Sequence, residues 1–317
     1  MATVHGRTVA DGGPDAPRDE RVADLVDRVR RVPDGHRSYT ESAERAVGVY
    51  RIPRDLLDRC LDHGLPHSGT GPELRFDRND VDNLVIGLGV ASPRVNGLRR
   101  IGNAFAELAA AGPEELVLEV SARCPEPGHP GGCEFALTMA AGLPAGAAER
   151  VGEQQYRIAL TRPAVPVRRV ELPEPWRAAV EGLADVRFHV LPDALSHDLG
   201  FLRESRLADC RLASRHLVAA VRAAGAAARP ATGLILVKPF PLYHWWVEAL
   251  IGGERVAVDP FFLRVLAELE IVDARDWPPD RAMSEVYWFT RSPGEQEAVA
   301  SLTAHNGVRA REMAILR

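Results

Sequence analysis

The sequence predicts an α+β protein in which a small helical domain precedes a β-containing region and a C-terminal core. Three observations predict this class. Between residues 21 and 90, apolar residues at helical spacing alternate with turn-forming residues. Between 114 and 161, short β-rich segments dominate. Near the C-terminus, an amphipathic helix is followed by strands that a Gly252-Gly253 pair connects as a hairpin.

The bulk properties are those of an ordinary globular chain. It has 317 residues with 46% hydrophobic and 26% charged residues, which suits one large domain or two smaller ones. The net charge of −5 gives no overall basic signature for nucleic acid. No apolar run reaches the ~18 residues that a membrane span needs. We expect a lead-in at 1–36, a small helical domain at 37–97, a connecting region at 98–194 and a core at 195–317.

The lead-in begins with a polar segment, Met1 to Glu20, which lacks the apolar core of a signal peptide. We therefore expect it to be disordered and the protein to be cytoplasmic. Residues 21–32 follow with apolar positions at helical spacing, which predicts a short amphipathic helix.

The next segment predicts three helices and a small hairpin. Thr40 or Ser42 caps a first helix, Pro53 starts a second, and Asp77 or Asn79 caps a third. A short strand is expected at 74–76. This order is that of a winged helix-turn-helix. The segments 46–49, 64–67 and 75–81 resemble the excisionase or MerR-type DNA-binding fold over about 45 residues.

The charges of the second helix weigh against DNA binding. A DNA-reading helix needs a net basic face for the phosphates. This helix is instead charge-balanced, and we favour an interaction or packing domain; its charged residues are Arg51, Arg54, Asp55, Asp58, Arg59, Asp62 and His63.

The connecting region is expected to hold a helix at 98–112, strands at 116–120, 133–139 and 156–161, and an extended proline-rich connector at 163–175. Cys124, His129 and Cys133 are candidate metal ligands, but a closed zinc site needs four ligands. Prolines and glycines fill the loop between them, so a turn-rich loop without metal is favoured. A Cys124–Cys133 disulfide at a hairpin neck does not suit the cytoplasm.

The predicted C-terminal core contains the candidate catalytic residues. A helix is predicted from about 209 to 224, with Gly225 after its end, followed by strands at 234–237, 243–251 and 255–258. Cys210 lies at the helix start, where the helix dipole favours a thiolate. His244 and Asp259 lie at the far end of the predicted hairpin, directly or diagonally opposite each other. Such an arrangement suits a nucleophile, a base and an orienting carboxylate.

These residues resemble the transglutaminase-like superfamily, which shares the papain-type core. The resemblance covers about residues 200–262 in three blocks: Asp209-Cys210 with the helix to Gly225 and Ala228-Arg229, then His244-Trp245-Trp246-Val247-Glu248, then Val258-Asp259-Pro260. It implies that Cys210 is the nucleophile, His244 the general base and then acid, and Asp259 the orienting group. Asp209 stands where the family often has glycine, and Phe261 where it often has threonine.

The function expected from these residues is acyl transfer through a thioester, forming an amide bond. The partners would be a peptide amide or carrier-protein thioester as donor and an amine as acceptor, with no cofactor, metal or membrane involved. Trp245 and Trp246 are candidate substrate-binding residues, one in the core and one lining the cleft. An amidase or cysteine peptidase and a non-catalytic DNA-binding regulator are the alternatives.

Overall fold

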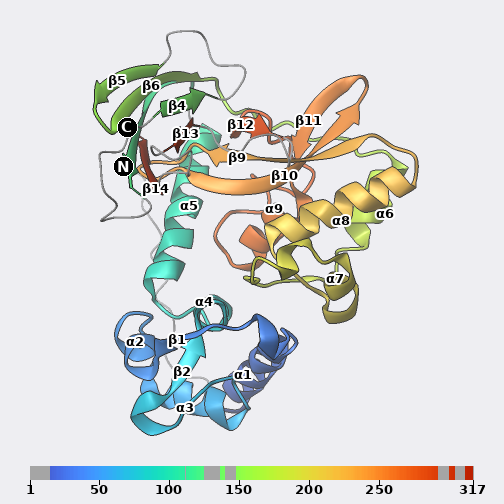
Figure 1. Ribbon diagram of the computed structural model, residues 1–317. Helices are drawn as coiled ribbons and strands as arrows, with labels where there is room; N and C mark the ends of the chain where they lie inside the picture. Colours follow the sequence, from blue (N-terminus) through green and yellow to red (C-terminus); the bar gives the residue numbers. More distant parts are fainter. Residues whose placement is uncertain are drawn as a thin grey trace, which may run out of the picture. The chain divides into compact units, whose positions relative to one another are not determined.

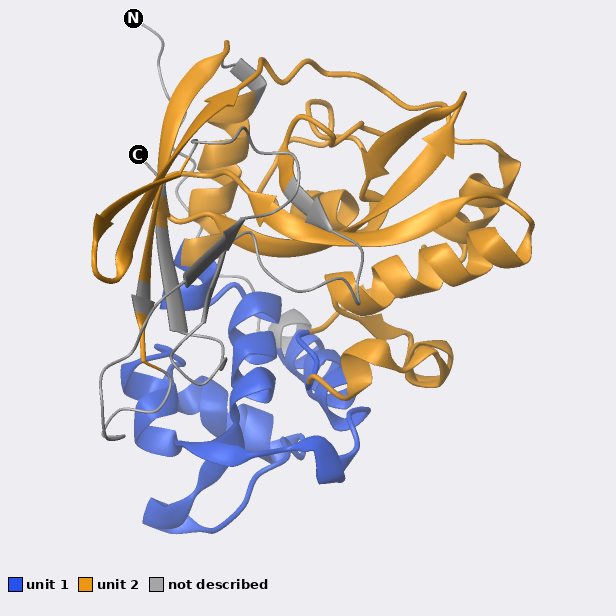
Figure 2. Ribbon diagram, turned by 45° about the horizontal axis from the view of Figure 1, so that its top comes forward, with its two compact units in different colours: residues 1–96, 190–192 blue, residues 97–189, 193–317 orange. Residues whose placement is uncertain are grey.

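A computed structural model describes residues 15–110, 112–124, 136–139, 148–291, 300–303 and 311–316. The protein is a mixed α/β chain. Its described part divides into two compact units, which Figure 2 colours separately. Unit 1 comprises residues 1–96 with 190–192, and unit 2 comprises 97–189 with 193–317. Residues 1–14, where part of the expected disordered lead-in falls, lie outside the described residues.

Unit 1 is helical with one small β-ribbon. Its elements are α1 (Asp15–Arg30), η1 (Asp34–His36), β1 (Tyr39–Ser42), α2 (Ala43–Gly48), α3 (Arg54–Asp62), η2 (Gly71–Glu73), β2 (Arg75–Asp77) and α4 (Arg78–Gly87), and β1 pairs antiparallel with β2 (Figure 1). The caps are local: Ser42 Oγ accepts from the backbone N–H of Arg45 at 3.1 Å, and the Asp77 carboxylate accepts from that of Asn79 at 2.8 Å.

A buried ion pair fixes the interior of unit 1. The Arg37 guanidinium donates to Asp80 Oδ2 at 2.7 Å and to the carbonyl oxygens of Val32 and Val29 at 2.7 and 2.8 Å. Burial raises the pKa of Asp80 to about 6, although Arg37 acts in the opposite direction. This pair therefore orders the end of α1, the following loop and α4 around one charged contact.

Unit 2 contains the remaining elements. They are α5 (Pro93–Ala110), which crosses the unit boundary, β3 (Glu114–Arg123), β4 (Ala136–Met139), β5 (Ala148–Gly152), β6 (Gln155–Arg162), α6 (Glu174–Glu181), β7 (Arg187–Phe188), η3 (Leu195–His197), α7 (Leu199–Ser205), β8 (Leu207–Ala208), α8 (Cys210–Ala223), β9 (Ala228–Ile235), β10 (Leu242–Ile251), β11 (Glu254–Val258), α9 (Pro260–Glu268), β12 (Tyr287–Arg291), β13 (Ala300–Thr303) and β14 (Arg311–Leu316).

The strands of unit 2 form separate antiparallel sheets, with one short parallel pair. One sheet has the order β11-β10-β9-β12 and another the order β14-β3-β6-β5. The pair β13-β4 is antiparallel, and β7-β8 is parallel. Because β14 pairs with β3, the expected connecting region and the C-terminal segment share a sheet. The boundary expected between residues 194 and 195 therefore does not separate two compact units.

The hairpin of β10 and β11 follows from its glycines. Gly252 and Gly253 have φ values of +60° and +88°, as a two-residue turn with a left-handed backbone at both positions requires. The neighbouring strand β9 starts at Ala228, six residues before the predicted strand at 234–237. Pro230 in β9 is unfavourable for a strand, because proline has no backbone N–H to donate. It pairs with Val247 of β10, and it lies beyond the described pairs of β9 with β12.

The core of unit 2 packs α5 and α9 around a cluster of aromatic residues. Phe105 and Trp246 are fully buried there, and Phe262 and Tyr287 nearly so. Gly102 lets α5 approach closely, because a Cβ at this position would overlap the carbonyl oxygen of Ile271. None of the helices in the described ranges is both long enough and apolar enough to cross a bilayer.

Candidate active site

The position of Cys210 is set by the start of α8. The Asp209 carboxylate caps this helix, accepting from the backbone N–H of Leu212 at 2.8 Å and from Ser196 Oγ at 2.6 Å. Buried side chains along one stripe of α8, among them Leu217 and Val221, face the strands β9 and β10 with which the helix packs (Figure 1). The first turn of α8 therefore presents Cys210 beside the sheet.

The hairpin brings His244 and Asp259 together. In the ladder between β10 and β11, Val247 lies opposite Val258, so the next residue, Asp259, is level with Trp246. His244 lies two residues further along β10, which makes the pair diagonal neighbours. The diagonal alternative of the sequence prediction is the one observed.

A buried hydrogen-bond network links His244 to the carboxylate. His244 Nε2 lies 2.5 Å from Asp259 Oδ2, and the side chains of both residues are at most 5% exposed. The Tyr287 hydroxyl donates to the same oxygen at 2.9 Å, and the backbone N–H of Phe262 donates to Oδ1 at 3.2 Å. Since Asp259 engages Nε2, Nδ1 is the ring nitrogen that remains for a thiol or a substrate.

Aromatic rings fix the orientation of the imidazole. The centroid of Phe262 lies 4.2 Å from that of His244, Tyr287 lies at 5.6 Å, and Trp246 stacks nearly parallel at 6.4 Å. Burial of the ring between these neighbours leaves it little rotational freedom. The network thus holds one tautomeric arrangement of the histidine in a largely apolar surrounding.

Cys210 reaches the aromatic cluster around His244 from the first turn of α8. It is partly buried against the apolar cluster that contains Trp246, Phe262 and Tyr287. Burial raises the pKa of its thiol well above the usual range, and the negative charges of Asp259 and Asp209 act in the same direction. A hydrogen bond from the backbone N–H of Cys210 itself lowers this pKa but does not offset the rise. The structure therefore brings Cys210, His244 and Asp259 into one site, but the helix start alone does not favour a thiolate as the sequence had indicated.

The two tryptophans of β10 have different surroundings. Trp246 is fully buried in the core. Trp245 is half-buried, and the Arg211 guanidinium lies over its ring at 4.8 Å from the centroid. Arg211 also forms an ion pair with Asp193 at 2.8 Å. Trp246 is thus a core residue with no exposed surface for a substrate, whereas Trp245 packs against Arg211, the residue that follows Cys210.

Sequence reasoning missed Tyr287, Phe262 and Arg211. Arg211 directly follows Cys210 in the sequence, which is the one signal that it lies near the site. Tyr287 comes from β12, 28 residues after Asp259, and no local pattern marks it. Phe262 is in α9, which starts at Pro260, where the sequence pattern predicts only the end of a strand.

The candidate metal ligands lie only in part among the described residues. Cys124 is a half-buried free cysteine, whereas residues 129 and 133 lie outside the described residues. Across the part of the chain that the structure describes, no three His, Cys, Asp or Glu side chains are placed to hold a metal ion.

Comparisons with known proteins give little. No protein-family model matches the chain, and no curated protein matches it. One solved structure, a protein from Cytophaga hutchinsonii provisionally described as a cysteine protease, is similar with 12% sequence identity and a TM-score of 0.30. The similarity covers 65% of this chain and 91% of that one. At this TM-score it supports no conclusion about the fold or activity, which leaves the site geometry as the basis for function.

Proposed function

We propose that this protein is a cysteine-dependent acyltransferase that works through a thioester on Cys210. The observation that carries the proposal is the buried hydrogen bond between His244 and Asp259, placed beside a cysteine at a helix start. In this assignment Cys210 is the nucleophile, His244 the general base and then acid, and Asp259 the group that orients the imidazole. The order of elements supports a papain-like, transglutaminase-like core.

The raised thiol pKa determines how the proton moves. Because the thiol is protonated at neutral pH, attack on a carbonyl requires a base at the moment of reaction. His244 Nδ1 takes the proton as the Cys210 sulfur bonds to the acyl carbon. The imidazolium is stabilised by Asp259 and then gives the proton to the leaving amine or thiol. The second substrate then attacks the thioester carbonyl and gives its proton to His244, which passes it to the departing Cys210 sulfur and so regenerates the thiol.

The oxyanion of the tetrahedral intermediate needs hydrogen-bond donors. The backbone N–H of Cys210 is at the first position of α8, where helix N–H groups have no partner within the helix. It is therefore our first candidate donor, and the positive end of the helix dipole supports the same charge.

The surroundings of the thiol favour transfer over hydrolysis. Cys210 packs against apolar and aromatic side chains, which disfavours water near a thioester. We therefore expect an amine acceptor, and a peptide amide or a carrier-protein thioester as donor. An amidase or cysteine peptidase would use the same residues with water as the acceptor.

Unit 1 is proposed to have a winged-helix-like fold that does not bind DNA. The helices α2, α3 and α4 and the β1-β2 ribbon support the fold. On α3, Arg54 pairs with Asp58 at 3.1 Å and Arg59 with Asp55 at 3.5 Å. These carboxylates neutralise the arginines that DNA phosphates would need.

Product partitioning tests the transfer activity. The protein is incubated with an acyl thioester and increasing concentrations of a primary amine, and amide and free acid are quantified by mass spectrometry. We expect amide formation that rises with amine concentration and disappears in Cys210→Ala. Free acid formed at a rate independent of the amine, and lost in Cys210→Ala, would identify a hydrolase instead.

A further inference from the structure

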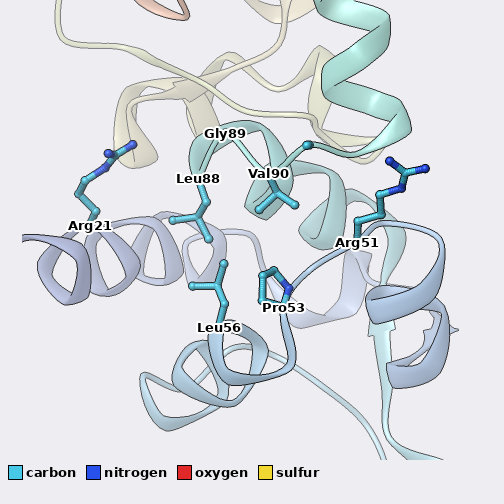
Figure 3. Close-up of a pocket in the computed structure, with 8 residues that line it drawn as sticks. Arg21, Arg51, Pro53, Leu56, Leu88, Gly89 and Val90 are labelled. Carbon is cyan, nitrogen blue, oxygen red and sulfur yellow. The ribbon is translucent and has the colours of Figure 1, made fainter. Parts of the chain in front are cut away.

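Unit 1 contains a pocket of about 420 Å³ that the proposed chemistry does not use. It lies between α1, the loop before α3 and the loop after α4. In Figure 3 the side chains of Leu56, Pro53, Leu88 and Val90 face a common space. The volume is in the range of small-molecule sites, and the floor is apolar as such sites usually are.

Two arginines flank this apolar floor, one on each side in Figure 3. Arg21 belongs to α1, and Arg51 belongs to the loop between α2 and α3. Neither has a carboxylate within ion-pair distance among the described residues, and no acidic side chain lines the pocket. The recorded hydrogen bond of Arg21, to the carbonyl oxygen of Gly87, is long at 3.5 Å. The pocket therefore combines an apolar floor with two cations that lack a counter-charge.

The backbone at Arg51 is a second, independent observation. Its φ is +60°, a left-handed conformation that costs a non-glycine residue free energy. This turn lets the backbone N–H of Ile52 donate to the carbonyl oxygen of Ala46 at 3.1 Å, and glycine would make the same turn at lower cost. The exposed Arg51 side chain makes no hydrogen bond or ion pair with the described residues that would offset the cost.

We propose that this pocket binds a small amphiphilic anion, with its apolar body on the floor and its carboxylate, sulfonate or phosphate at the rim, where Arg21 and Arg51 make the potential positive. Arginine suits oxyanions because its planar guanidinium donates two parallel hydrogen bonds. A nucleic acid would meet only two cations and an apolar hollow, so it fits these surroundings less well. This site is independent of Cys210.

The test uses 8-anilino-1-naphthalenesulfonate, an aromatic anion whose fluorescence rises in apolar sites, titrated into the full chain. We expect saturable binding with a Kd of about 1 mM or lower. Arg21→Gln and Arg51→Gln should each weaken it severalfold, because each removes one of the two positive charges that attract the anion. Arg30→Gln is the matched control, because nine residues at 100° place Arg30 on the opposite face of α1. Cys210→Ala should bind like the wild type.

Arg51→Gly separates a binding role from a structural one. It removes the strain and the cation together, so we expect a higher melting temperature with binding weakened as much as in Arg51→Gln. The proposal is wrong if the probe does not saturate, if Arg30→Gln weakens binding as much as the pocket variants do, or if Arg51→Gly binds as tightly as the wild type. A neutral analogue, N-phenyl-1-naphthylamine, that binds equally well would overturn the role of the anion.

Discussion

Asp209 caps α8 and also acts on the neighbouring thiol, and Asp209→Asn separates these two effects. Asparagine is as good an N-cap as aspartate, and its carbonyl oxygen can still accept from the backbone N–H of Leu212. The substitution removes the negative charge that contributes to the raised pKa of Cys210. We therefore expect a more acidic thiol in a helix that keeps its N-cap hydrogen bond.

The magnitude follows from the proximity of the two side chains. Adjacent residues place the charges about 7 Å apart, which at an effective dielectric constant of about 20 gives roughly 2 kcal/mol. The apparent pKa of Cys210 should then fall by about 1 to 2 units. Burial raises the pKa of Asp209 itself, so the full difference is expected on the alkaline side, where its carboxylate is ionised. The free energy of unfolding at neutral pH should not fall, because the cap is kept and the ionised carboxylate, which burial disfavours, is removed.

The assay is the rate of iodoacetamide labelling at Cys210, followed by peptide mass spectrometry between about pH 6 and pH 10. Asp198→Asn is the matched control, because Asp198 caps α7 in the same way, accepting from the backbone N–H of Gly200 at 2.8 Å. Its labelling profile should equal that of the wild type. An Asp209→Asn profile that is unchanged, or displaced to higher pH, in a folded protein would refute the electrostatic reasoning.

Further predictions concern the hydrogen-bond network and the packing. Tyr287→Phe removes a donor to the carboxylate of the triad and should slow Cys210 acylation about tenfold, with about 1 kcal/mol lost in stability; the exposed Tyr243→Phe should change neither in the same kinetic and thermal measurements. In Gly102→Ala the new methyl group would overlap a backbone carbonyl oxygen just beyond α9, so the free energy of urea unfolding should fall by about 1 to 3 kcal/mol. Gly97 lies on the same helix with open space around it, so Gly97→Ala should be neutral or stabilising. Burial raises the pKa of Asp80 from 3.8 to about 6, so ionisation of this carboxyl is disfavoured in the folded state and the free energy of unfolding falls as pH rises through this window. Between pH 4 and 7 the wild type should lose about 3 kcal/mol relative to Asp80→Asn. Parallel plots of unfolding free energy against pH for the two proteins would contradict this.

Local signals in the sequence were sufficient for the elements that hold His244 and Asp259. The Gly252-Gly253 pair determines the turn, and the turn determines which residues are neighbours across the hairpin. The capping residues of α2, α4 and α8 likewise act within a few residues. Such features can be predicted because their causes lie close together in the chain.

Long-range pairing could not be predicted in the same way. One of the two partners of β3 is β14, almost 200 residues later, and Tyr287 reaches the carboxylate from β12. The thiol pKa also depends on burial, which reverses the effect expected from the helix start. Sequence spacing carries no information about this desolvation, because it is produced by the packing of distant elements.

The central claim is that Cys210 becomes acylated with His244 as its base. The most direct measurement is the rate of acyl-enzyme formation from an activated thioester, located by intact-mass and peptide mass spectrometry in the wild type and in His244→Ala. We predict one acyl group on Cys210, none on Cys60 or Cys124, and a rate at neutral pH at least about a hundredfold lower in the variant. Equal rates in the two proteins, or acylation at another residue, would contradict the proposed triad.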